Sequence, residues 1–178
     1  MSPRGRRIAL GAGVAVAAAA AGAGLAWWRT GLRAPHDDAL ALFWQQTFAD
    51  SAGRPWPMAD LRGRALVINY WATWCPPCVE EMPELSGLAR ELAGKPVQIL
   101  GIGIDNASNI RNFAEKAKFD YPLLIGGVAG NELGRQMGNT GGYLPFTVVV
   151  DRAGRISARI LGRFKLDDLR QRAVAALG

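Results

Sequence analysis

The chain has 178 residues, of which 49% are hydrophobic and 20% charged, enough for one domain with a proper core and too few for two comfortable ones. Its formal net charge is +6, but Arg4, Arg6 and Arg7 supply half of that charge and no acidic residue precedes Asp37. After Arg29 the basic and acidic residues are interspersed, as on a solvated mixed surface, so we expect no nucleic-acid partner.

The N-terminal segment, residues 1–28, has the pattern of a membrane span. An uncharged run from Ile8 to Trp28 is long enough for a helix across about 30 Å of hydrocarbon. Arginines before the run and a tryptophan pair at its end favour an anchor with the amino terminus inside and the rest of the chain exported. A cleaved signal peptide is the alternative, and Arg6-Arg7 also allows a twin-arginine export signal, although the surrounding residues fit that pattern poorly.

The exported part divides into a spacer and a domain. Residues 29–38 are short, polar and proline-containing, which is typical of a linker, and the domain is predicted to cover residues 39–178. Residues 45–49 and 56–58 should form a β-hairpin at the start of the domain. The apolar run ALVINYW, residues 65–71, predicts a strand buried on both faces.

A helix is predicted over residues 75–92, because apolar residues recur every three or four positions along it. Pro83 lies inside this helix and should kink it. The remaining elements are strands at 96–104, 121–125, 146–150 and 155–161, and helices at 108–118, 131–137 and 166–176. Strands that alternate with helices predict an α/β fold with helices on both faces of the sheet.

Both cysteines lie in the stretch WATWCPPC, residues 71–78, where the buried strand meets the first turn of the helix. A helix start carries unpaired N–H groups and about half a positive charge, which stabilise an anion. Cys75 should therefore form a thiolate readily, whereas Cys78 should be more enclosed and harder to ionise. One thiol would attack and the other would resolve.

A disulfide between Cys75 and Cys78 would close a very short loop and would constrain the unfolded chain little. Such a disulfide is better suited to reversible formation and reduction than to stabilising the fold. A structural disulfide is one alternative, since exported proteins carry them. A metal pair is another, but tetrahedral sites usually need four ligands and the only histidine, His36, lies in the spacer. We expect no metal and no organic cofactor besides the redox-active disulfide.

The stretch WATWCPPC, Pro83 five residues after Cys78, and YLPFTVVVDRAGRI at residues 143–156 closely resemble the thioredoxin superfamily. Within it the chain is similar to the TlpA/ResA-like thiol-disulfide oxidoreductases, over about residues 43–177. This resemblance implies a thioredoxin-like fold with a central mixed β-sheet flanked by helices and an N-terminal hairpin extension. It also implies a single-pass anchor in a bacterial inner membrane, with the catalytic domain in the periplasm.

The resemblance implies a docking surface beside the cysteines. In the family a proline matching Pro145 is cis, and residues just before it, here Leu144, pair with the substrate backbone. Tyr143 and Trp74 would border that surface. Each of these two aromatics could instead be partly buried with no contact to substrate.

The chain departs from thioredoxin itself at two positions. The buried carboxylate of thioredoxin, six residues before the first cysteine, falls on Asn69, and the matching lysine falls approximately on Gly101. TlpA/ResA-like proteins carry an acid that matches Glu81, three residues after Cys78. If burial raises its pKa, this carboxyl could take and return the Cys78 proton. A solvated helix acid is the alternative for Glu81.

The direction of electron flow depends on the residues between the cysteines, Pro76 and Pro77, which tune the reduction potential without fixing it by reasoning alone. The resemblance favours reduction of disulfides in exported proteins, for example in cytochrome c maturation. The enzyme would then be a protein-disulfide oxidoreductase that receives electrons from a membrane thiol carrier.

Two other function classes stay open. A peroxiredoxin-like thiol peroxidase is suggested by Thr73 two residues before Cys75, but that pattern has proline where this chain has Asn69. A copper carrier would use both thiols as ligands, but such carriers usually add a histidine from the folded domain. Peroxide consumption and tight Cu(I) binding are the observations that would favour them.

Overall fold

The computed structural model describes residues 35–178. The predicted membrane segment, residues 1–28, and most of the predicted spacer lie outside the described residues. Within the described part, no helix is both long and apolar enough to cross a membrane. The first described element is helix α2 (Pro35–Gln45), which begins inside the predicted spacer and which the sequence analysis did not predict.

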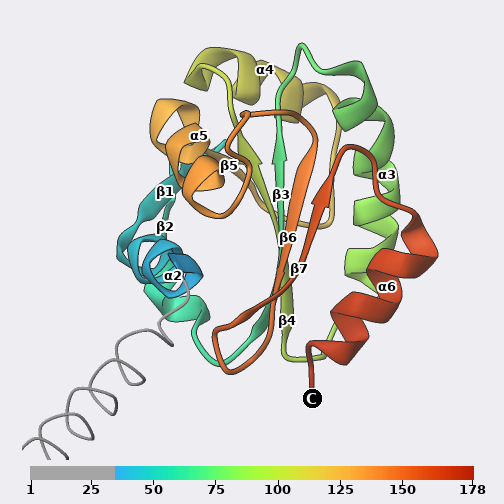
Figure 1. Cartoon of the computed structure of the whole chain (residues 1–178). Coiled ribbons are helices and arrows are strands. Elements are labelled where there is room, and N and C mark those ends of the chain that lie inside the picture. The colour runs from blue at the N-terminus through green and yellow to red at the C-terminus, as the bar shows by residue number, and fades with distance from the viewer. Residues whose placement is uncertain (1–34) are drawn as a thin grey trace, which may run out of the picture. The chain divides into compact units, whose positions relative to one another are not determined.

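The domain contains one seven-stranded sheet of order β2-β1-β5-β4-β3-β6-β7 (Figure 1). Strands β3, β4 and β5 are parallel to one another, and the other pairings are antiparallel, so the sheet is mixed as expected. In chain order after α2 the elements are β1 (Thr47–Asp50), β2 (Pro55–Pro57), the 3-10 helix η1 (Met58–Leu61), β3 (Ala65–Trp71), α3 (Pro76–Glu91), β4 (Val97–Gly103), α4 (Ala107–Lys116), β5 (Leu123–Ile125), α5 (Gly127–Gln136), β6 (Phe146–Val150), β7 (Ile156–Leu161) and α6 (Leu166–Ala175).

Helices cover both faces of the sheet, which explains why every residue of β3 is buried. Helices α3 and α6 lie on one face and α2 and α5 on the other, as Figure 1 shows. Because successive strand residues point to opposite faces, alternate residues of β3 enter two separate hydrophobic cores: Ala65, Val67 and Trp71 pack with α3, and Leu66, Ile68 and Tyr70 pack with α2 and α5. The continuous apolar run is therefore a central strand, as predicted.

The predicted hairpin is present and extends the sheet. Strands β1 and β2 pair antiparallel, with Phe48 opposite Trp56, and β1 also pairs with β5. The hairpin turn is organised by Asp50, whose side chain is almost fully buried. Its carboxylate accepts hydrogen bonds from the backbone N–H groups of Ala52 and Arg54 and from the side chains of Arg54 and Trp56, at 2.8 to 3.3 Å.

These hydrogen bonds control the charge of Asp50. Burial alone would raise the pKa of this carboxyl, but the backbone and guanidinium of Arg54 and the indole N–H of Trp56 together lower the pKa below its usual range. Asp50 is therefore a structural anion that ties the hairpin turn together.

Candidate active site

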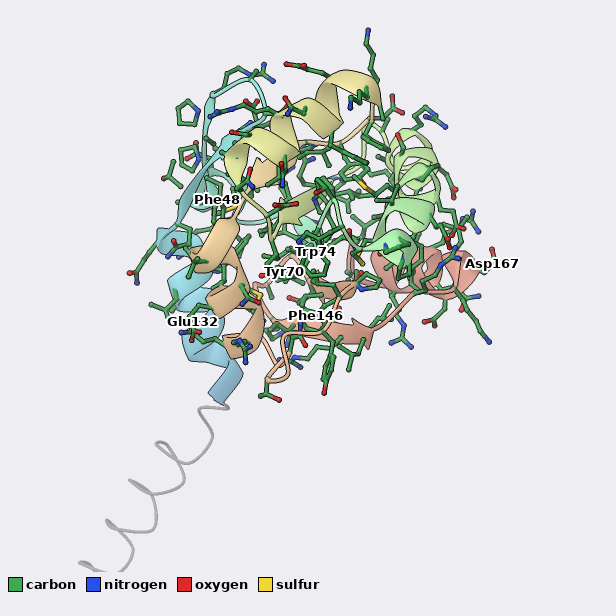
Figure 2. The ribbon with its side chains drawn as sticks, turned by 90° about the horizontal axis from the view of Figure 1, so that it is seen from above. Phe48, Tyr70, Trp74, Glu132, Phe146 and Asp167 are labelled. Atoms are coloured by element: carbon green, nitrogen blue, oxygen red, sulfur yellow. A yellow bond between two sulfur atoms is a disulfide. The ribbon has the colours of Figure 1, made fainter. Side chains whose placement is uncertain are left out.

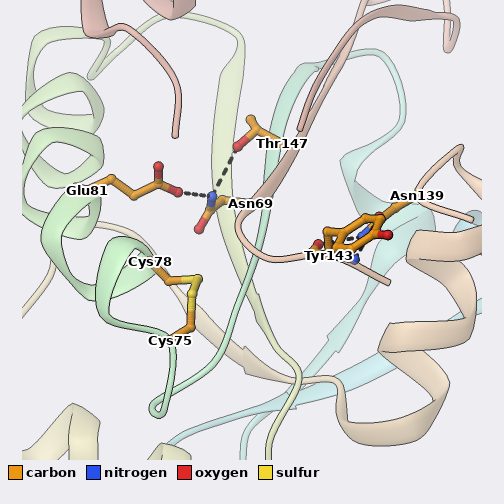
Figure 3. Close-up of a disulfide and its surroundings, with 7 residues drawn as sticks. All are labelled: Asn69, Cys75, Cys78, Glu81, Asn139, Tyr143 and Thr147. Carbon is orange, nitrogen blue, oxygen red and sulfur yellow. Dashed lines mark hydrogen bonds between the residues drawn. A yellow bond between two sulfur atoms is a disulfide. The ribbon is translucent and has the colours of Figure 1, made fainter. Parts of the chain in front are cut away.

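The two cysteines lie at the junction of β3 and α3, and their sulfurs form a disulfide with an S–S distance of 2.03 Å (Figure 3). Cys75 is the N-cap residue of α3 and the helix begins at Pro76, one residue after the predicted start, so Cys75 lies at the helix start as predicted. Prolines at the first helical positions cost little, because N–H groups there have no partner within the helix. The N–H groups of Cys78 and Val79 both bond to the Cys75 carbonyl. The peptide dipoles of α3 are thus aimed at Cys75, while its first two residues offer no N–H donor.

In this disulfide form both cysteines are enclosed. Cys75 retains 4% of its surface and Cys78 none. The neighbouring Pro76 is exposed, whereas Pro77 is half-buried. Pro83 lies on the exposed side of α3, which continues through it to Glu91.

Glu81 lies one turn after Cys78 and faces the sheet, where its side chain is fully buried. The solvated alternative for this residue is therefore wrong. Its Oε1 accepts a hydrogen bond of 2.7 Å from Asn69 Nδ2, which also donates to Thr147 Oγ1 at 3.1 Å (Figure 3). Within the described part of the chain, Glu81 Oε2 has no hydrogen-bond partner.

This environment sets the protonation state of Glu81. Burial raises the pKa of its carboxyl to about 7, although the Asn69 hydrogen bond, the Phe164 backbone N–H and the positive charge of Arg163 oppose the rise. A carboxyl with such a pKa holds and releases a proton near neutral pH. It therefore has the property required of a general acid and base.

Three strands supply the row of residues opposite Glu81. In the sheet register Asn69 on β3 lies between Gly101 on β4 and Thr147 on β6. A Cβ atom at Gly101 would come within 2.9 Å of Leu123 Cδ2, 3.1 Å of Tyr121 Cε2 and 3.2 Å of Trp71 Nε1. Large neighbours thus fill the space above Gly101, and Asn69 with Thr147 forms the polar floor under Glu81.

Arg163, which the sequence analysis did not single out, lies beside Glu81 on the outer side. It follows β7 and bonds Glu80 Oε2 at 3.0 Å and Glu84 Oε1 at 3.3 Å. These two partners flank Glu81 along α3, so the guanidinium is held near a carboxyl that it does not contact. No local sequence pattern identifies such a pairing across 83 and 79 positions.

The predicted docking residues lie at the same end of the molecule. The Leu144-Pro145 peptide bond is cis, as predicted. Leu144 packs against both hydrophobic clusters, and Phe146 pairs with Tyr70, so the cis peptide lies at the end of β3 that leads to the cysteines. Trp74 and Tyr143 are 66% and 65% exposed, so the buried alternative is wrong for both, and their contact with substrate stays a prediction. Figure 2 looks down on this end, where Trp74 is labelled.

Asn139 is a buried polar residue at this end that the sequence analysis missed. Its side chain donates to the Tyr143 carbonyl at 2.7 Å and accepts from the Tyr143 N–H at 3.0 Å (Figure 3). The sequence signal was weak, because asparagine among glycines, GNTGG at 138–142, indicates a turn and nothing more.

Thr73, the residue behind the peroxidase alternative, has a partner of its own. Its hydroxyl donates to the Asp105 carboxylate, on the loop between β4 and α4. Asp105 also accepts from the N–H and the side chain of the next turn, at Asn106 and Asn109. This arrangement fastens the residues before Cys75 to the adjacent loop.

Comparisons with known proteins agree with this geometry. The Redoxin family model matches residues 37–177. Thiol-disulfide oxidoreductase ResA of Geobacillus thermodenitrificans is 30% identical over 126 residues, which cover 69% of each chain. Thiol:disulfide interchange protein HelX of Rhodobacter capsulatus is 38% identical over 62% of this chain and 60% of its own length. The solved structure of a thioredoxin-family thiol:disulfide interchange protein from Chlorobium tepidum TLS matches with a TM-score of 0.64 and 29% identity, covering 75% of this chain and 93% of the other.

Proposed function

Because the chain belongs to the Redoxin family and joins its two cysteines at a helix start, we infer that it is a thiol-disulfide oxidoreductase working through Cys75 and Cys78. It is TlpA/ResA-like within the thioredoxin superfamily, and its substrates carry disulfides. The observation that carries the mechanism is the buried Glu81 carboxyl, one helical turn from Cys78.

The reduced enzyme transfers two electrons to its substrate in two exchange steps. The Cys75 thiolate attacks one sulfur of the substrate disulfide, forms a mixed disulfide and expels the other sulfur as a thiolate. Cys78 then attacks Cys75 Sγ, which closes the Cys75–Cys78 disulfide and releases the second substrate thiolate.

Glu81 assists the second step in our proposal. The thiol of Cys78 is a poor nucleophile until its proton leaves. An ionised Glu81 accepts that proton, and its pKa of about 7 lets it return the proton when the disulfide is reduced again. Asn69 supports the ionised form by donating to Oε1.

We further propose that the enzyme is a reductant of disulfides in exported proteins, including those that must be reduced in cytochrome c maturation. The relatives named ResA and HelX support this proposal. Residues 1–28 would anchor the chain in a bacterial inner membrane with the domain in the periplasm, or would be cleaved as a signal peptide. A membrane thiol carrier would supply the electrons, because the periplasm is oxidising.

Cysteine variants test the chemistry. With dithiothreitol as electron source, the wild-type chain should reduce insulin, and Cys75→Ser should abolish this activity. Reduced Cys78→Ser, mixed with insulin after the dithiothreitol has been removed, should accumulate a mixed disulfide, because no second thiol is present to resolve it. Unchanged insulin reduction by Cys75→Ser would refute the mechanism.

An equilibrium redox titration tests the direction. A midpoint below about −200 mV would support a reductant, and one near about −120 mV would reject it. Localisation is tested separately by membrane fractionation and by the mass of the mature chain, which distinguishes a retained anchor from a cleaved signal.

A further inference from the structure

The segment that leads into the cis proline is held by one side chain. Asn139 is 95% buried, with 5% of its surface exposed, although it lies in a glycine-rich surface loop. Its amide bonds both backbone groups of Tyr143, the N–H at 3.0 Å and the carbonyl at 2.7 Å. Paired hydrogen bonds of this kind are what a neighbouring β-strand would offer. The side chain of Asn139 thus takes the place of a strand for this one residue.

The backbone of Pro145, which follows Leu144, has no free hydrogen-bonding group either. Pro145 has no N–H, and its carbonyl accepts a hydrogen bond of 2.9 Å from the Gly162 N–H. Between these two positions, the N–H and the carbonyl of Leu144 make no hydrogen bond within residues 35–178. Leu144 is therefore the residue of this segment whose backbone can pair with an incoming chain.

The Tyr143 side chain is positioned by the same loop. Its ring is exposed and lies over Gly141, where a Cβ atom would come within 2.1 Å of Tyr143 Cε2. Gly142 N–H bonds to the Asn139 carbonyl at 2.9 Å, which closes the turn between the two residues. Asn139 and Gly141 together hold the Tyr143 backbone inward and its ring outward.

We propose that Asn139 is a positioning residue for polypeptide substrates, which restricts backbone pairing to Leu144 and presents the Tyr143 ring beside it. This inference rests on the proposed function and adds to it a residue that positions the segment before the cis proline. An extended polypeptide that carries a disulfide uses the Leu144 backbone and the Tyr143 ring. A small disulfide without a peptide backbone uses neither, and it depends on the cysteines alone.

The test compares two substrates in the full-length chain. Insulin supplies a polypeptide disulfide, and bis(2-hydroxyethyl) disulfide supplies one without a backbone. Asn139→Ala should lower kcat/KM for insulin about 10-fold, mainly through KM, since about one net hydrogen bond of positioning is lost. Its rate with the small disulfide should stay within about twofold of wild type, and its midpoint potential should not move.

Two further variants keep the test decisive. Asn139→Asp retains the volume and the acceptor but cannot donate to the Tyr143 carbonyl, so it should show the same selective loss if Asn139→Ala does not fold. Gly141→Ala displaces the Tyr143 ring without changing Asn139, and should cause a smaller loss on insulin only. Thr140→Ala is the matched control and should behave as wild type, because this exposed loop side chain makes no hydrogen bond within residues 35–178.

Each contrary outcome has its own meaning. Equal losses on both substrates, or an unaltered KM for insulin in a folded Asn139 variant, would overturn the positioning role. Wild-type reduction of the small disulfide but not of insulin would overturn polypeptide docking while leaving the thiol chemistry intact. Failure of the wild-type chain on both substrates would refute the proposed function itself.

Discussion

Two buried carboxylates, Asp50 and Glu81, have opposite protonation behaviour. Asp50 in the hairpin turn is 4% exposed and accepts hydrogen bonds from two backbone N–H groups, a guanidinium and an indole. Glu81 on α3 is fully buried, and its donors are the Asn69 amide and the Phe164 backbone N–H. The pKa of Asp50 is lowered and that of Glu81 is raised to about 7.

The comparison shows that burial alone does not make a carboxyl reactive. Removal from water disfavours the charged form of both groups, and the number of donors decides whether that penalty is offset. A structural carboxylate must keep its charge, and the donors around Asp50 ensure that it does. A catalytic carboxyl must change its charge, and Glu81 has fewer donors than Asp50: the Asn69 amide and the Phe164 backbone N–H, with Oε2 unpartnered within residues 35–178.

The largest expected effect is on how stability depends on pH. Between pH 4.5, the ordinary pKa of a glutamate, and about 7, the folded chain keeps a proton on Glu81 that the unfolded chain has released. As pH rises through this window, the Glu81 contribution should therefore reduce the free energy of unfolding by about 3 kcal/mol in total. Denaturant unfolding of the oxidised wild-type and Glu81→Gln chains at several pH values measures this difference. A difference that stays constant with pH would contradict the assignment.

The second effect is on the rate. Glu81→Gln cannot accept the Cys78 proton, so insulin reduction at pH 7 should fall about 100-fold, within the range of general acid and base catalysis. The inflection near pH 7 in the pH–rate profile should also disappear. Glu84→Gln is the matched control on the same helix and should change the rate less than about twofold. Retention of the inflection in Glu81→Gln would assign it to another group.

The third effect distinguishes Asp50 from Glu81 directly. Asp50→Asn should destabilise the chain by about 2 kcal/mol at pH 7, because hydrogen bonds to a charged acceptor are weakened. The lowered pKa means that this stabilisation is present above the unfolded value of 3.8 and is lost as pH falls through the folded value. Thermal unfolding and insulin reduction together test the prediction. A loss of activity in the folded Asp50→Asn chain would contradict a purely structural role.

The fourth effect probes the side-chain donor of Glu81, Asn69. Asn69→Leu removes the hydrogen bond to Oε1 and adds apolar surface, so the pKa of Glu81 should rise by about one unit. The midpoint of the pH–rate profile reports this rise. Thr147→Val is the control, since Thr147 accepts a hydrogen bond from Asn69 and makes none with Glu81 within residues 35–178. An unchanged or lower midpoint in Asn69→Leu would show that the hydrogen bond does not set the pKa.

The smallest effect comes from Arg163. Its positive charge lowers the pKa of Glu81 from a position near the surface, so Arg163→Gln should raise the midpoint by about 0.3 units at low salt. The shift should shrink in about 1 M salt, where the Debye length is about 3 Å. Arg170→Gln is the control: it breaks two similar ion pairs, with Glu91 and Asp167, and should not change the midpoint of the pH–rate profile.

The parts of the fold that the sequence predicted are those with strong local patterns. The buried strand β3 follows from its unbroken apolar run, and the start of α3 follows from the Cys-Pro-Pro-Cys stretch after it. Helix α2 was missed because its polar beginning, PHDD, was interpreted as a spacer. Its buried face, including Phe43 and Trp44, is stabilised by packing against the sheet rather than by a local signal.

The site divides in the same way. The cysteines and the cis proline belong to recognisable motifs, so their positions could be predicted. Asn139 could not, because its role depends on a turn that returns its amide to Tyr143. Arg163 and its partners Glu80 and Glu84 lie about 80 positions apart in the sequence. They come together only when α3 packs on the sheet to which β7 belongs.

The crowding at Gly101 has an evolutionary consequence. A lysine there, as in the carboxylate and lysine arrangement of thioredoxin, would collide with Leu123, Tyr121 and Trp71 at its first side-chain atom. Replacing Asn69 by an acid would therefore create a buried charge, and a lysine at position 101 could pair with it only if these neighbouring side chains also moved. The strand carboxylate with its lysine and the carboxyl on α3 are thus separated by epistasis. A lineage that uses the α3 carboxyl would change to the other arrangement only through several coordinated substitutions.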